Sequence, residues 1–118
     1  RRTALLRVIS AHDLTEIRSA LDDTPEAHEV CAGALAEASL ELNRRVKERE
    51  DRCAHTRVNT EVLDGPASAV LTAASHHADL LIAGAQRLDG ERRGVRIGPT
   101  THTLLRHTAC PLLIVPHR

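Results

Sequence analysis

Residues 78–84 read ADLLIAG and residues 110–115 read CPLLIV, and these two pieces decide how the rest of the chain can fold. Each contains a short apolar run without polar alternation, Leu80–Ala83 and Leu112–Val115. Such runs are typical of strands buried on both faces, as in a parallel sheet covered by helices. Between them lies a glycine-containing loop that ends where a helix should begin. In open α/β folds, such a helix start is the usual place for an anion.

The chain before this stretch predicts further strands and helices in alternation. Residues 1–10 are expected to form a strand, residues 13–23 a loop with one or two helical turns, and residues 56–63 an alternating edge strand. A helix is expected to begin near Pro66. Strands that alternate with helices indicate a parallel sheet with right-handed crossovers.

A long helix is predicted to begin at Pro25. Thr24 can act as its N-cap, and proline suits the first helical position. Its apolar residues recur at helical spacing and form one stripe. The stripe consists of Cys31, Leu35, Ala38, Leu42 and Val46.

Composition limits the classes of protein to consider. The 118 residues contain no Phe, Tyr, Trp or Met, so the core must be aliphatic. The 16 basic and 16 acidic side chains cancel, which predicts neither nucleic acid nor a membrane surface as partner. Cys31, Cys53 and Cys110 lack C-x-x-C spacing, which favours reduced thiols and a cytoplasmic location over a disulfide framework. No run approaches the ~20 apolar residues of a membrane span.

Both ends of the deciding stretch resemble the universal stress protein family, whose domain has a strand ending in Asp-Leu and three apolar residues before Gly, and a last strand that follows Cys-Pro. Residues 79–84 and 110–115 match these two motifs, and residues 65–67 match a third less exactly. The resemblance implies an α/β fold with an open parallel sheet in three α/β/α layers, Rossmann-like and of the adenine nucleotide alpha-hydrolase type. It also implies one domain over residues 1–118 that lacks the family's first strand and helix. Because that strand is central in the family's sheet, more chain at the N-terminus, or another segment, is expected to fill its place.

The resemblance also implies a nucleotide site. In family members that bind ATP, the glycine loop and the following helix start hold the phosphates and ribose. Gly84 and Gly98 match loop glycines, and Thr101 matches a hydroxyl position. The expected nucleotide-binding residues are Gly84, Arg87, Gly98, Thr100 and Thr101, with ATP as ligand and Mg²⁺ as its accompanying ion.

Two departures from the family pattern weigh against this site. Arg87 stands where a second glycine is expected, and its bulk crowds a phosphate although its guanidinium could pair with one. Pro99 stands where the family has Ser or Thr, and it removes both a hydroxyl and an N–H donor. The competing interpretation is a solvated loop in which Pro99 is an ordinary first helical residue.

Three functions remain open from the sequence. The first is a non-enzymatic stress-response sensor or regulator that forms a homodimer through the C-terminal strand, Pro111 to Val115. The second is a regulatory or dimerisation module of a larger tandem protein that binds no nucleotide. The third is a weak ATP hydrolase, although the sequence contains no Gly-x4-Gly-Lys-[Ser/Thr] loop and no Gly-x-Ser-x-Gly elbow.

Overall fold

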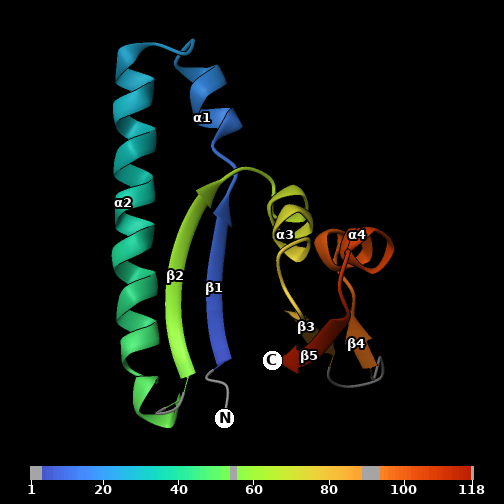
Figure 1. The fold of residues 1–118 in the computed structure, drawn as a ribbon. Coiled ribbons are helices and arrows are strands. Elements are labelled where there is room, and N and C mark those ends of the chain that lie inside the picture. Colours follow the sequence, from blue (N-terminus) through green and yellow to red (C-terminus); the bar gives the residue numbers. More distant parts are fainter. Residues whose placement is uncertain (1–3, 54–55, 89–93, 118) are drawn as a thin grey trace. The chain divides into compact units, whose positions relative to one another are not determined.

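The computed structural model describes residues 4–53, 56–88 and 94–117, without the side chains of residues 53, 86–88, 94–96 and 117 (Figure 1). The backbone forms two compact units, Arg1–Pro66 and Ala67–Arg118, and each is described by itself.

The first unit is a pair of parallel strands with a long helix beside it (Figure 1). Its elements are β1 (Ala4–His12), α1 (Thr15–Ala20), α2 (Pro25–Lys47), the 3-10 helix η1 (Glu50–Cys53) and β2 (Thr56–Asp64). The pairing runs in one register from Ala4 opposite Thr56 to His12 opposite Asp64. The predicted strands and long helix are confirmed, and the helical turns expected within residues 13–23 form α1.

Helix α2 begins where the sequence predicts. The Thr24 hydroxyl accepts the N–H of Ala27 at 3.3 Å, and Pro25 occupies the first turn. Of the predicted stripe, Cys31 is buried and the other four residues are half-buried. A hydrogen bond from the Thr60 hydroxyl to the Asn43 side chain links β2 to α2. The stripe and this bond therefore hold the helix along the strand pair.

Helix α1 ends in a turn that places two aspartates in the left-handed region. Asp22 and Asp23 both have φ of 52°. The Asp23 N–H donates to the carbonyl of Arg18 at 2.9 Å, which closes the turn. Left-handed residues after a helix are usually glycine, because a Cβ is unfavourable in this conformation.

Asp22→Gly is therefore expected to raise the free energy of unfolding by about 0.5–1 kcal/mol, since glycine adopts this φ without strain. Urea unfolding followed by circular dichroism measures the change. Asp22→Asn is the control, because it removes the charge and keeps the Cβ. Equal stabilisation by both variants would show that charge at the helix end, and not backbone strain, is relieved.

A network of charges lies on the exposed face of α2. Glu41 accepts hydrogen bonds from Arg44 at 2.6 and 3.1 Å and from Arg45 at 2.9 Å. The hydrogen bonds from Arg44, and then those from Arg45, lower the pKa of Glu41 to about 2. Because the group is exposed, solvent screening keeps its contribution to stability small.

This network predicts a pH dependence. A carboxylate whose pKa falls on folding contributes stability above its unfolded pKa, and the contribution disappears as the pH falls through the folded value. Wild-type protein is thus expected to be slightly more stable than Glu41→Gln at pH 6, and the difference should shrink between pH 4.5 and about 2. Urea midpoints of both proteins across this range test it, and a difference that does not change with pH would contradict it.

The second unit is a small sheet with two helices. Its elements are α3 (Ala67–Ser75), β3 (Leu81–Leu88), β4 (Gly94–Arg96), α4 (Pro99–His107) and β5 (Leu112–His117). The strand order is β4-β3-β5. Strand β5 is parallel to β3, with Leu81 opposite Leu112, and β4 is antiparallel to the end of β3, with Arg87 opposite Val95.

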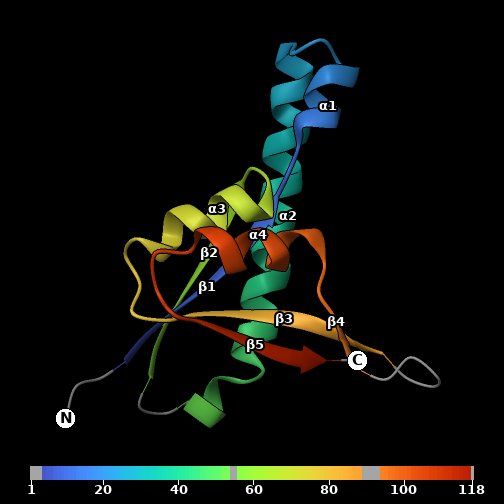
Figure 2. The ribbon, with the colours of Figure 1, turned by 90° about the vertical axis from the view of Figure 1, so that its right-hand side faces the viewer.

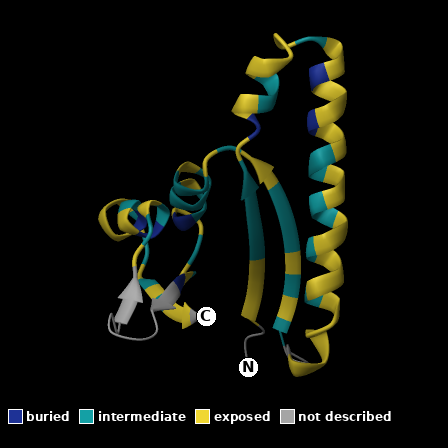
Figure 3. Ribbon diagram, turned by 180° about the vertical axis from the view of Figure 1, so that it is seen from behind, coloured by how far each residue is buried: buried dark blue, intermediate teal, exposed yellow. Residues whose placement is uncertain are grey.

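The core of this unit is formed by buried positions at the end of α3, on β3 and on α4 (Figure 3). Leu104 is 0% exposed and Ser75 is 1% exposed. The Ser75 hydroxyl donates to the carbonyl of Thr72 at 2.6 Å and accepts the N–H of Ala109 at 3.0 Å. It therefore connects the end of α3 to the segment that leads into β5.

Two expectations for this unit were wrong. Strand β3 does not end at Gly84 but continues to Leu88, because the antiparallel β4 pairs with its last residues. The strands are also not buried on both faces: the buried Leu81 and Ala85 alternate with Ile82, which is 54% exposed. Val115 on β5 is 44% exposed as well. Within the described residues, one face of the β3–β5 pair is covered and the other is not.

Candidate functional site

The first turn of α4 offers backbone donors at the end of β4 (Figure 2). Gly98 is the N-cap, with φ of −76° and ψ of 174°, and Pro99 follows in the first turn. The backbone ladder begins with the N–H of His102, which donates to the Gly98 carbonyl at 3.0 Å. The N–H groups of Thr100 and Thr101 precede that bond and have no acceptor within the helix. Together with the helix dipole, they favour a negatively charged group.

Open space adjoins Gly98. A Cβ built on this residue meets no heavy atom of the described residues within 4 Å. Glycine is thus not required here by its φ or by a protein neighbour. The space on the Cβ side is available to a ligand atom or to a larger side chain.

The two predicted threonines contribute differently. Thr100 is half-buried, whereas Thr101 is only 6% exposed. Because its side chain is buried, Thr101 can contribute to this surface mainly through its N–H. Thr103, which sequence reasoning did not single out, donates its hydroxyl to the Pro99 carbonyl at 3.0 Å and so braces the first turn. Its spacing of four residues from Pro99 was the available signal.

The other two predicted residues lie on β3 and not in a loop. Gly84 is exposed and sits opposite Val115 of β5. Arg87 sits opposite Val95 of β4, and its side chain lies outside the described residues. The structure therefore groups Gly98, Thr100 and Thr101 at the start of α4 and places the backbones of Gly84 and Arg87 on β3.

Charges around the helix start are described only in part. Helix α4 has no acidic residue in its first turn, and Arg106 and His107 lie in its last turn. The charged loop residues that precede β4, which include Asp89 and Glu91, lie outside the described residues. His102 is exposed on α4.

The described residues contain neither a metal-binding cluster nor a membrane-spanning helix. Among them, no group of three or more His, Cys, Asp or Glu side chains is arranged to hold a metal ion. None of the helices in the described part of the chain combines the length and apolar character that a membrane crossing requires.

A solved structure resembles this chain in fold, and a family model matches its sequence. A solved structure of the hypothetical protein MJ0577, from a study on structure-based assignment of biochemical function, is similar with a TM-score of 0.74 and 18% identity. The likeness covers 99% of this chain and 78% of that one, and at this identity it shows the fold alone. It confirms the predicted α/β fold class. No curated protein matches the sequence. The model of the universal stress protein family matches residues 2–116, and the chain therefore belongs to that family.

Proposed function

We propose that this universal stress protein domain is a non-enzymatic sensor or regulator of the cytoplasmic stress response that binds an adenine nucleotide, ATP, at the start of α4. The nucleotide phosphates would accept hydrogen bonds from the N–H groups of Thr100 and Thr101. Mg²⁺ would accompany the phosphates and neutralise part of their charge. Gly84 and Arg87 would adjoin the site from β3.

The observation that carries this proposal is the helix start itself. Two N–H donors without an intrahelical acceptor stand beside a glycine whose Cβ direction meets no atom of the described residues within 4 Å. This arrangement can accept a phosphate without displacing a side chain. Membership of the family supports adenine nucleotide as the ligand that brings the phosphate.

Pro99 lowers the number of hydrogen-bond donors at the start of α4 but leaves the N–H groups of Thr100 and Thr101. Proline lacks an N–H and a hydroxyl, so it takes away one donor that serine or threonine would supply. It also fixes φ near −65° at the first helical position, which holds the next two N–H groups in place. We therefore expect weak binding with intact geometry.

Native mass spectrometry with ATP and Mg²⁺ tests nucleotide binding. One nucleotide per chain that is displaced by excess ADP but not by adenosine would support a phosphate-directed site. A protein that stays free of nucleotide at millimolar ATP would contradict the proposal, and would leave a regulatory module as the better interpretation.

We further propose a homodimer through β5, over Pro111 to Val115. Strand β5 is at the edge of the order β4-β3-β5, so its outer backbone groups can pair with a second copy. Leu113 and Val115, 49% and 44% exposed, would become buried alongside. Sedimentation equilibrium at micromolar protein tests this assembly. A monomer throughout, or a dimer unaffected by Leu113→Lys, would contradict it.

A further inference from the structure

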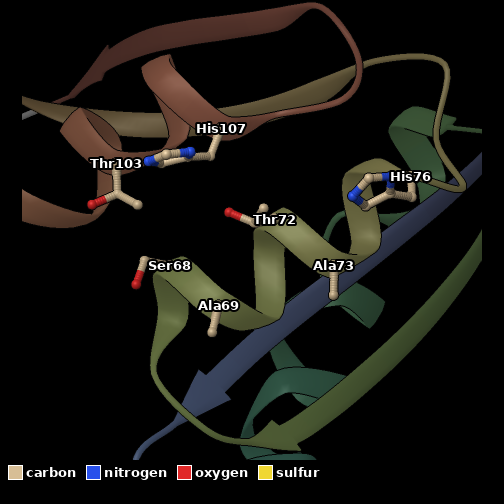
Figure 4. A pocket seen from close by; sticks show the side chains of 7 residues that line it. All are labelled: Ser68, Ala69, Thr72, Ala73, His76, Thr103 and His107. Carbon is tan, nitrogen blue, oxygen red and sulfur yellow. The ribbon is translucent and has the colours of Figure 1, made fainter.

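A hollow of about 620 Å³ lies between α3 and α4 (Figure 4). Helix α3 contributes two hydroxyls, those of Ser68 and Thr72, with alanines between them, and His76 follows directly after the helix. Helix α4 contributes one threonine and one histidine, four residues apart. The lining consists of Ser68, Ala69, Thr72, Ala73, His76, Thr103 and His107. The hollow is a wide groove that is open to solvent along most of its surface, and not an enclosed cavity.

The hollow remains open because the side chains of α3 that border it include small alanines. Ala69 and Ala73 are the residues of α3 between its polar positions, and a methyl group occupies little of the space between two packed helices. Figure 4 shows the Ser68 hydroxyl directed away from Thr103, and the His107 ring lying along α4 toward Thr103. The open volume is therefore bordered by hydroxyls and an imidazole from both helices.

One of these hydroxyls lacks a hydrogen bond. Thr72 Oγ1 exposes less than 1 Å² and has no partner among the described residues. Ser75 and Thr103, by contrast, both donate to backbone carbonyls. Buried hydroxyls normally have a partner, and an exception calls for an explanation such as a ligand or water. Figure 4 shows this hydroxyl on the side of Thr72 that faces α4, but with less than 1 Å² exposed it does not reach the open surface of the hollow without a rotation.

Thr72 can present its hydroxyl to the hollow at little cost. Threonine in a helix divides between two χ1 rotamers, because the hydroxyl can bond to a carbonyl one turn earlier. In the structure Thr72 makes no such bond, so a rotation would break none. A ligand that offers an acceptor would satisfy the group.

The lining also indicates the class of ligand. It contains no carboxylate, so nothing in it repels an anion or selects a cation. The hydroxyls of Ser68 and Thr72 and the imidazoles of His76 and His107 can all donate hydrogen bonds. Ser68 also lies in the first turn of α3, at the positive end of that helix.

We propose that this hollow, which we call the α3–α4 hollow, binds a small tetrahedral oxyanion of the phosphate class. Oxygens of the anion would accept from Ser68, from Thr72 after rotation, and from His107. This site is separate from the start of α4 and does not depend on the proposed nucleotide function. The phosphate could be inorganic or part of a larger molecule.

Titration of the ¹⁵N-labelled full chain with inorganic phosphate at pH 6.5, followed by amide chemical shifts, tests the proposal. We expect saturable shifts over residues 68–76 and 103–107 at millimolar phosphate. Shifts that do not saturate, or that are confined to residues 98–101, would overturn the proposal. The same titration with ATP distinguishes the source, because shifts in the hollow with ATP would show that an organic phosphate enters as well.

Matched variants make the test specific. Thr72→Val keeps the shape of the side chain and is expected to weaken phosphate binding at the hollow at least fivefold, with no fall in the thermal midpoint, since the hydroxyl it removes is unpaired. Ser68→Ala is the second variant should Thr72→Val fold poorly. His107→Gln should also weaken binding, whereas His102→Gln, on the same helix but outside the lining, should not. Unchanged affinity in Thr72→Val and Ser68→Ala would overturn the assignment.

Discussion

Leu104→Ala is expected to lower the free energy of unfolding by about 2–5 kcal/mol, as is usual when a buried leucine is truncated and leaves a cavity. Leu104 is 0% exposed and is the largest fully buried side chain among the described residues. The core holds no aromatic residue, because the sequence has none. Few neighbouring side chains can therefore move in to fill the space.

Leu105→Ala is the matched control for this prediction. Leu105 is the next residue of α4 and is 51% exposed. Its truncation should change the free energy of unfolding by less than about 1 kcal/mol, since exposed substitutions have small effects. Urea unfolding followed by circular dichroism measures both, because no tryptophan or tyrosine is present for fluorescence. Similar losses in both variants would show that α4 does not bury the face described above.

Gly98→Asp is expected to weaken nucleotide binding at least ~10-fold, through repulsion between its carboxylate and a phosphate held at the helix start. The stability of α4 should not fall in this variant. Gly98 now caps α4 without a side-chain hydrogen bond, and a Cβ here meets no atom within 4 Å. Aspartate is among the preferred N-cap residues, so stability should be equal or slightly higher.

Gly98→Asn separates charge from size. Asparagine caps a helix as well as aspartate does and has the same shape. If the phosphate binds at this helix start, the asparagine variant should lose far less affinity than the aspartate variant, and the deficit of the aspartate variant should shrink in high salt. Isothermal titration calorimetry with ATP and Mg²⁺ measures both variants. Equal affinity of Gly98→Asp and wild type would place the nucleotide elsewhere.

The sequence predicted the elements that depend on local signals. Thr24 and Pro25 marked the start of α2, and the apolar run before Gly84 marked β3. Both follow from side chains that act within one or two turns or along one strand. The family motifs at residues 79–84 and 110–115 added the fold class.

What the sequence did not reveal depends on contacts between elements. Strand β3 extends beyond Gly84 because Gly94–Arg96 pair with it, and three residues carry too little pattern to predict a strand. The exposure of Ile82 depends on which face the helices cover. The start of α4 after Gly98 could be predicted from the sequence, but the burial of Thr101 depends on how α4 packs.

The parallel pairing of β1 with β2 has a consequence for how fast the first unit can fold. Every bridge in this pair, from Ala4 with Thr56 to His12 with Asp64, joins residues far apart in the chain. A separation of about fifty residues means that a long loop must close before the first bridge forms, and non-local pairing of this kind slows folding. Helix α2 can form within microseconds, since its contacts are local. Refolding experiments should thus show helical signal appearing well before the strands are protected from hydrogen exchange.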